Sequence, residues 1–203
     1  LAHPMEPTSA TAAGGCQGTL RFTLTTRGVA AHSARAGLGR HAIHDAGDVL
    51  ARLSAYQPRS VAVDGLVYRE GLNAVGITGG VATNVIPDAC VVTVNFRFAP
   101  DRDAENALAH CREVFEGYEL VVTDLALGAR PGLDTPIARD FVAATGGEPS
   151  AKYGWTDVAR FSALGVPAVN FGPADPGKAH ADDEQCPIAD LYTCRDALQR
   201  WLS

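Results

Sequence analysis

Residues 88–98, Asp-Ala-Cys-Val-Val-Thr-Val-Asn-Phe-Arg-Phe, alternate apolar and polar side chains over their last seven positions. A period of two places successive side chains on opposite faces of an extended chain, so this stretch predicts a strand with one buried face. The side chains expected to be buried are Val92, Val94, Phe96 and Phe98. Such a strand needs another layer of structure over its apolar face.

Five further segments surround this strand in the sequence. Residues 16–28 alternate in the same way, residues 67–78 are strand-like, and residues 118–125 form a last strand. Between them, apolar residues at three- and four-residue spacing predict amphipathic helices at 38–56 and 103–116. The order strand, helix, strand, strand, helix, strand is the split βαβ arrangement. It closes as a four-stranded antiparallel sheet with two helices on one face.

The pattern of predicted helices and strands changes after residue 127. A Gly/Pro linker is followed by alternating helices and short apolar strands, which indicate a layered α/β unit with a mostly parallel sheet. That sheet lacks preceding strands to complete it. The expected elements are helices at 136–144, 156–164 and 188–202 and strands at 150–153 and 166–171.

Composition excludes several classes of function. The net charge of −6 leaves no basic excess for binding a phosphate backbone, so nucleic acid is not expected as a partner. No apolar run approaches the roughly 20 residues that span a bilayer, and the first residues do not form a signal peptide, so we expect a cytoplasmic protein. The five cysteines show no CxxC spacing, which argues against a disulfide framework and a thiolate zinc site.

Three places in the sequence could carry chemistry. Pro7 forces Glu6 into an extended conformation and so projects its carboxylate. An apolar strand runs into a Gly/Pro loop that ends on His180 beside acidic residues, a position where α/β sheets place ligands. His32 follows the end of the first long strand. Taken singly, each has an ordinary interpretation as an exposed loop or surface residue.

Together with their neighbours, these residues form an ordered set of motifs. Glu-Pro-Thr at 6–8 is followed by a Gly-x-x-x-His at 28–32 and by TNVIPD at 83–88 with VNFRF at 94–98. The last motifs are YGWTDVARF at 153–161 and FGPADPGKAHADDE at 171–184. In this order they resemble the succinyl-diaminopimelate desuccinylases, within the wider aminoacylase and carboxypeptidase family of di-zinc hydrolases. The resemblance runs over essentially the whole chain.

The resemblance implies a fold and an assembly. In that family a zinc-binding α/β catalytic domain is interrupted by a split βαβ lid that also forms the dimer interface. Residues 1–15 and 128–203 would then be parts of an incomplete catalytic domain, and residues 16–127 the inserted α+β (ferredoxin-like) lid and dimerisation domain. A homodimer through this lid is expected. The chain begins with Leu1 and reaches Glu6 without a preceding helix or strand, so we expect a fragment.

The resemblance also implies roles for single residues. Glu6 and His180 would be ligands to the two zinc ions, and His32 would be the catalytic histidine that reaches across the dimer to polarise the scissile carbonyl. Asn84 and Arg97 would bind substrate, Arg97 by a bidentate grip on a carboxylate. The loop expected to line the substrate pocket contains Gly154, Trp155 and Thr156.

The implied reaction is removal of succinate from N-succinyl-L,L-diaminopimelate, an acylated amino acid, in lysine and diaminopimelate biosynthesis. Two zinc ions, or cobalt in their place, would activate a water molecule and polarise the amide. The family's amino-terminal His, bridging Asp and Glu-Glu pair are not in this sequence, and catalytic zinc ordinarily takes three protein ligands. We therefore expect the 203 residues alone to be inactive and to bind zinc weakly.

Other functions stay open at this stage. The acyl group is less secure than the reaction type, because Trp155 stands where a small hydroxyl residue is common in the family. A deacetylase of the acetylornithine type or a carboxypeptidase would keep the same enzyme class. A binding or dimerising module without catalysis is a third alternative, and there Glu6 would point away from His180.

Overall fold

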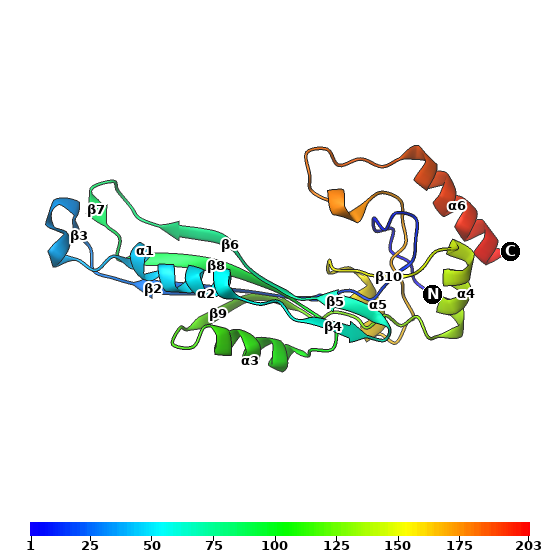
Figure 1. Ribbon diagram of the computed structural model, residues 1–203, viewed down its shortest axis with the longest axis horizontal. Helices are drawn as coiled ribbons and strands as arrows, with labels where there is room; N and C mark the ends of the chain where they lie inside the picture. Colours follow the sequence, from blue (N-terminus) through cyan, green and yellow to red (C-terminus); the bar gives the residue numbers. More distant parts are fainter.

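Two units lie end to end along the long axis of the molecule (Figure 1). The computed structural model describes all 203 residues, Leu1–Ser203. We call residues 18–126 the sheet unit, because they contain the four-stranded sheet. Residues 1–14 and 128–203 form the terminal unit, where both chain ends lie. Two short crossings, before residue 18 and after residue 126, join the units covalently.

The sheet unit has the predicted split βαβ topology, and all pairs of neighbouring strands are antiparallel. The strands lie in the order β6-β8-β2-β9. They are β2 (Gly18–Arg27), β6 (Gly71–Gly79), β8 (Ala89–Phe98) and β9 (Leu120–Ala126). The helices are α1 (Ala42–Asp45), α2 (Gly47–Ala55) and α3 (Ala104–Val114).

One face of this sheet carries the core of the unit. Every second residue of β8 is buried, as its alternation predicts. These side chains form one cluster of 15 buried residues with the inner faces of α1, α2 and α3, so the helices cover the same side of the sheet. Phe22 packs edge to face on Phe115, with ring centroids 5.7 Å apart. Complete burial of such a ring contributes about 1.5–3 kcal/mol.

The structure interrupts two elements that the sequence predicts as continuous. The expected helix at 38–56 is two shorter helices, α1 and α2, and the residues before Ala42 lie outside them, with a 3-10 turn at Ser33–Leu38. The expected strand at 67–78 is divided at Glu70, whose side chain is completely buried among cationic partners. Its first half, β5 (Leu66–Arg69), turns back on β4 (Ser60–Val63) as a hairpin.

A tight turn creates this hairpin. Asp64 and Gly65 both adopt positive φ, +47° and +86°. Two consecutive left-handed residues fit the right-handed twist of a two-residue hairpin, and Asp-Gly is a preferred sequence for it. The dipeptide was therefore a readable signal for the hairpin. A second small ladder pairs β3 (Ala31–His32) with β7 (Val85–Ile86) at the far end of the sheet unit.

The terminal unit contains little sheet. Its helices are α4 (Pro136–Thr145), α5 (Val158–Ala163) and α6 (Ile188–Leu202), with a 3-10 turn at Pro176–Lys178. Its one ladder pairs β1 (Ala13–Gly14) with β10 (Ser150–Ala151) in parallel. The predicted strand at 166–171 was wrong in form: only the isolated bridges Ala2↔Ala168 and Ala13↔Asn170 occur. These partners are single residues, and a ladder needs longer neighbouring strands.

A small aromatic core nevertheless holds the terminal unit together. Phe141 packs edge to face against both Phe171 and Trp201, with centroid separations of 5.2 Å. Large apolar side chains remain exposed on the outside, among them Leu164, Ile188 and Leu202. No helix in the chain has both the length and the apolar character needed to cross a lipid bilayer.

Candidate functional site

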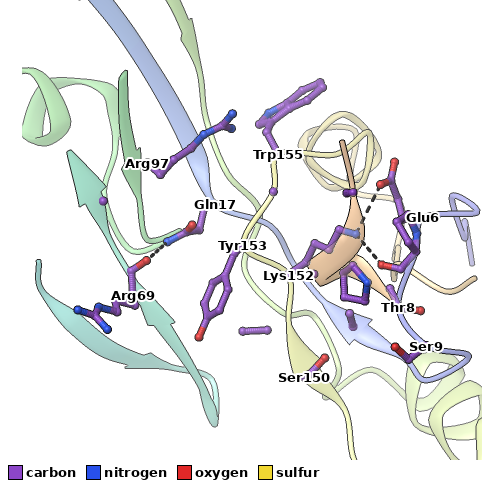
Figure 2. A pocket seen from close by; sticks show the side chains of 18 of the residues that line it. Glu6, Thr8, Ser9, Gln17, Arg69, Arg97, Ser150, Lys152, Tyr153 and Trp155 are labelled. Atoms are coloured by element: carbon purple, nitrogen blue, oxygen red, sulfur yellow. Dashed lines mark hydrogen bonds and ion pairs between the residues drawn. The ribbon is translucent and has the colours of Figure 1, made fainter. Parts of the chain in front are cut away.

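A cleft of about 890 Å³ lies between the two units. Its two walls come from different parts of the chain, and Figure 2 shows side chains of both facing the space between them. The terminal unit contributes the segments around Glu6 and Lys152 and the loop before His180, and the sheet unit contributes the ends of β5 and β8. Polar and charged lining side chains include Glu6, Gln17, Arg69, Arg97, Lys152, Tyr153, Trp155 and His180.

The Glu6 segment is fixed by its neighbours in the terminal unit. Thr8, which is 5% exposed, accepts a hydrogen bond from the Gly172 N–H at 3.0 Å. The N–H of Thr8 donates to the Gly172 carbonyl at 3.3 Å. A Cβ at residue 172 would lie 2.4 Å from the Glu6 carbonyl oxygen, so only glycine fits there. These contacts hold Glu6 against the start of the loop that carries His180.

His180 lines the same cleft as Glu6, although the two residues are 174 positions apart in the sequence. The histidine is exposed and has a positive φ of +66°. Its N–H donates to Glu184 Oε2 at 3.1 Å, so an acidic residue of the same loop fixes the backbone and leaves the imidazole without a partner.

Lys152 is a functional candidate that the sequence analysis missed. It follows β10 directly, is 8% exposed, and donates from Nζ to the Pro7 carbonyl at 2.9 Å. The same Nζ lies 3.5 Å from Glu6 Oε2 (Figure 2). Burial lowers the pKa of Lys152 from its ordinary value, and the negative charge of Glu6 opposes that shift. No motif marked this lysine, because the neighbour that gives it meaning lies 146 positions away.

Arg97 occupies the opposite wall. It comes from the end of β8 and makes neither a hydrogen bond nor an ion pair, and Figure 2 shows its guanidinium extending toward Trp155. Burial lowers its pKa from the ordinary value, as does the positive charge of Arg21. The guanidinium stays charged at neutral pH. An unpaired cation at the edge of a cleft is suited to binding an anion.

The loop at 154–156 lies partly in the wall of the cleft and partly in the interior of the protein. Gly154 and Trp155 line the cleft, and the Trp155 indole donates from Nε1 to the Leu127 carbonyl at 3.0 Å. Its ring is also covered by Arg160, with 5.5 Å from Cζ to the ring centroid. Thr156, expected in the pocket, is 3% exposed and does not line the cleft. Its hydroxyl has no partner in the chain.

His32 and Asn84 lie together at the far end of the sheet unit, away from the cleft (Figure 1). The β3–β7 ladder places His32 opposite Val85, and the N–H of Ser33 donates to the Asn84 carbonyl at 2.9 Å. His32 is exposed, and its Nδ1 accepts from the Ala34 N–H at 3.1 Å. Neither residue can therefore contact a ligand in the cleft of its own chain.

The donor atoms in the cleft are of the kind that binds a metal ion, but there are too few of them to complete a site. A carboxylate oxygen and an imidazole nitrogen are ordinary zinc ligands, and Glu6 and His180 supply one of each. A catalytic zinc takes three protein ligands. The chain contains no group of three or more His, Cys, Asp or Glu side chains that could hold a metal. These residues form at most part of a metal centre.

Comparison with curated proteins gives consistent relatives. The chain is 55% identical over 199 residues to a Mycobacterium tuberculosis protein described as a candidate succinyl-diaminopimelate desuccinylase, covering 97% of this chain and 56% of the relative. It is 47% identical to the succinyl-diaminopimelate desuccinylase of Corynebacterium glutamicum, covering 98% and 55%. An acetylornithine deacetylase of Myxococcus xanthus is 30% identical, covering 96% and 55%. The chain thus spans about half the length of these relatives.

Solved structures and a family match agree on the fold. A tripeptidase from Staphylococcus aureus superposes with a TM-score of 0.72 at 21% identity, covering 98% of this chain and 54% of the tripeptidase. Residues 15–120, which include strands β2, β6 and β8, match the peptidase dimerisation domain of the M20 peptidases. This match covers more than half of the 203 residues. The chain therefore belongs to the M20 peptidase family.

Proposed function

We propose that this chain is part of an amide hydrolase that removes succinate from N-succinyl-L,L-diaminopimelate, in the biosynthesis of diaminopimelate and lysine. One observation carries the proposal: Glu6, His180 and Arg97 come from three distant parts of the sequence and line a single cleft. The two desuccinylase relatives, at 55% and 47% identity over nearly the whole chain, support the choice of substrate.

The charges of the cleft suit an anionic acyl group. Lys152 is paired with Glu6, and the two arginines Arg59 and Arg102 are paired with two carboxylates, those of Glu70 and Asp101, so these charges largely cancel. Arg97 and Arg69, which both line the cleft, have no such partner, and Figure 2 shows the Arg69 guanidinium directed away from Lys152 and Glu6. A succinyl group ends in a free carboxylate, which a planar guanidinium can bind through two parallel hydrogen bonds. Arg97 is therefore the residue proposed to recognise the acyl carboxylate.

The walls beside Arg97 suit the rest of an acylated amino acid. The Trp155 indole is held in place by its bond to the Leu127 carbonyl and presents a flat apolar surface to the acyl chain. Gly154, directly before it, adds no side chain to the wall. Thr156 is buried behind this wall, and we propose that it holds the loop in position without contacting the substrate.

Zinc is the proposed metal, with cobalt as an alternative, and Glu6 and His180 would each hold one of two ions. The bound metal would supply an activated water molecule and polarise the amide carbonyl. Glu6 and His180 cannot complete two sites. The remaining ligands would come from the part of the relatives that this chain does not span. The Thr8–Gly172 bonds keep the two ligand-bearing segments together.

A homodimer through the sheet unit is part of the proposal. Residues 15–120 match a domain that is named for dimerisation. Strand β6 is an edge of the sheet, and its Val75 and Ile77 are more than half exposed, so it offers unpaired backbone groups and apolar surface to a second copy. His32, and with it Asn84, would then enter the cleft of the partner subunit.

The domain division of the sequence analysis stays a proposal as well. Residues 1–15 and 128–203 would belong to the catalytic domain, and residues 16–127 to the lid and dimerisation domain. The two crossings between the units, before residue 18 and after residue 126, support boundaries at these positions.

The test uses the complete protein, assayed on N-succinyl- and N-acetyl-amino acid substrates side by side. We expect the succinyl substrate to be hydrolysed at least about 100-fold more efficiently, because a site built around a charged group rejects an analogue that lacks it. Arg97→Met should remove most of this preference by raising KM for the succinyl substrate. Arg112→Met, an exposed arginine on α3, is the matched control and should change nothing. Equal rates on both substrates would favour the acetylornithine type.

A second candidate function is a dimerising module without catalysis. It is favoured only by the incomplete set of metal donors. Under that alternative the complete protein would hydrolyse neither substrate, and His180→Ala would be without effect on any activity.

A further inference from the structure

Two arginines stand on the same wall of the cleft. Arg97 lies near the end of β8, and Arg69 is the last residue of β5. Both line the cleft, and neither guanidinium group makes a hydrogen bond or an ion pair within the chain. The cleft therefore has two free guanidinium groups, and both belong to the sheet unit.

The strand register explains why these arginines share a wall. Gly71, the first residue of β6, pairs with Arg97 across the β6–β8 ladder. Residues two apart in an extended chain point to the same side, so Arg69 lies on the same face as Gly71. Burial alternates accordingly, and the buried residues of this stretch are Tyr68, Glu70 and Leu72. Because the buried side chains of β8 face the helices, both arginines lie on the sheet face that the helices leave open.

The backbone of Arg69 is held in place while its side chain is free. Gln17, which is 2% exposed, donates from Nε2 to the Arg69 carbonyl at 2.7 Å (Figure 2). The next residue, Glu70, has a completely buried side chain. The Arg69 side chain itself is exposed. This arrangement places a mobile cation at a fixed position of the wall, as a binding site for an anion requires.

The two guanidinium groups reach different parts of the cleft. Figure 2 shows that of Arg97 extending toward Trp155, and that of Arg69 directed away from Lys152 and Glu6. A planar guanidinium binds one carboxylate through two parallel hydrogen bonds. Two such groups that extend in different directions suit two carboxylates that are separated from each other. The sheet-unit wall is therefore suited to a ligand with a carboxylate on each of two arms.

The substrate of the proposed function has such a shape. Its scissile amide would lie beside Glu6 and His180, and Arg97 would bind the succinyl carboxylate. On the other side of the amide, one carboxylate is attached to the carbon next to the amide nitrogen, so it stays close to the amide. The other carboxylate stands at the far end of the diaminopimelate chain. Arg69 is the remaining unpaired arginine of the cleft lining that could bind it.

We propose that Arg69 is a specificity-determining residue that binds the distal carboxylate of N-succinyl-L,L-diaminopimelate. The identity of this ligand rests on the proposed function. Because Arg69 and Arg97 come from one sheet, movement of one unit against the other leaves their relative position unchanged. Arg69 would distinguish diaminopimelate from lysine, which has the same carbon chain and terminal amine but lacks the distal carboxylate.

The experiment compares two substrates of the complete protein, N-succinyl-L,L-diaminopimelate and Nα-succinyl-L-lysine. They differ only in the distal carboxylate. We expect kcat/KM to be at least about 30-fold higher for the diaminopimelate substrate, because a charge-assisted bond is lost with the lysine substrate. Arg69→Met should reduce this ratio to below about threefold by raising KM for the diaminopimelate substrate. Arg69→Lys keeps the charge without the planar fork and should retain part of the ratio.

The control variants separate this role from a general loss of binding. Arg97→Met should weaken both substrates by a similar factor, because both retain the succinyl carboxylate, and so should preserve the ratio. Arg112→Met, on the exposed side of α3, should change neither substrate. A ratio that persists in Arg69→Met would overturn the assignment. A wild-type ratio near one would also overturn it and would leave desuccinylation itself in place.

Binding measurements keep the test separate from the proposed function. If the complete protein hydrolyses neither substrate, the proposed function fails, and isothermal titration calorimetry with free L,L-diaminopimelate and L-lysine decides the role of Arg69. We expect diaminopimelate to bind at least about tenfold more tightly than lysine, and Arg69→Met to abolish this difference. Equal affinities in the wild type, or a difference that survives in Arg69→Met, would show that Arg69 does not bind the distal carboxylate.

Discussion

Lys152 and Glu6 form an ion pair at 3.5 Å inside the cleft, and the same ammonium group donates to the carbonyl of Pro7 at 2.9 Å. The lysine comes from the segment after β10 and the glutamate from the amino-terminal residues. The pair therefore joins two pieces of the terminal unit that are far apart in sequence. It also holds the carboxylate that the proposed function assigns to a metal.

Replacing Lys152 should loosen this junction. Lys152→Met keeps most of the volume but leaves the partly buried Pro7 carbonyl without its donor, so we expect a loss of about 1–2 kcal/mol in the free energy of unfolding. Urea denaturation of the chain measures it. Lys178→Met, which removes a largely exposed pair with Asp183, is the control and should cost less than about 0.5 kcal/mol. Equal losses in the two variants would show that the Pro7 contact is unimportant.

Because of Glu70, the free energy of unfolding should depend on pH in the acidic range. Burial alone would raise its pKa, but hydrogen bonds from Arg102, Arg59 and the Ala99 N–H outweigh burial and hold the pKa below its usual value. A carboxyl group with a lowered pKa in the folded state stabilises the protein above its unfolded pKa of about 4.3, and this contribution is lost as the pH falls through the folded pKa. We expect stability to drop below about pH 4.

Glu70→Gln tests this dependence. At pH 7 it leaves the largely buried Arg102 without an ion-pair partner, while Arg59 keeps Asp101, and we expect a loss of about 3 kcal/mol in unfolding free energy. The variant should also lose part of the acid dependence, so wild type and variant should converge as the pH falls. Parallel pH profiles of the two proteins would contradict the assignment.

Gly172→Ala should displace the Glu6 segment in the wall of the cleft. The added Cβ would lie 2.4 Å from the Glu6 carbonyl oxygen, and the segment would have to move away. We expect a loss of at least about 2 kcal/mol, within the range for overpacking and displaced backbone. Gly37→Ala, where nothing lies within 4 Å of the new atom, is the control and should be nearly neutral in thermal unfolding. A neutral Gly172→Ala would show that this approach is not tight.

The 203-residue chain should bind zinc only weakly. Two donors cannot complete a catalytic site, so we expect a dissociation constant weaker than about 1 μM by isothermal titration calorimetry. Glu6→Gln and His180→Ala should each weaken the residual binding further. Stoichiometric binding tighter than about 1 μM would mean that further residues of the chain are metal ligands.

The sheet unit was predictable because its information is local. The alternation in residues 88–98 and the helical spacing of residues 103–116 each follow from neighbouring positions, and the structure has β8 and α3 there. The helix predicted at 38–56 was wrong in its continuity and in its start, because the α-helical residues begin at Ala42. The break at Glu70 could not be read locally, because Arg59 and Arg102, which bury this carboxylate, lie 11 and 32 positions away.

The residues of the site were predictable only where they stand in a recognisable motif. Glu6, Arg97, Trp155 and His180 stand in recognisable stretches, and all of them line the cleft. Lys152 directly precedes the motif at 153–161 without being part of it, and its importance depends on the distant Pro7 carbonyl. The strand expected at 166–171 failed for a related reason, since a strand requires partners, and the chain offers only single residues there.

The paired hydrogen bonds between Thr8 and Gly172 also bear on how the chain folds during synthesis. They join residues 164 positions apart, whereas the sheet unit closes within residues 18–126. As the polypeptide leaves the ribosome, these bonds of Thr8 cannot form until residue 172 emerges. We expect the middle of the chain to become ordered first and the two ends to be gathered last, when the cleft is formed.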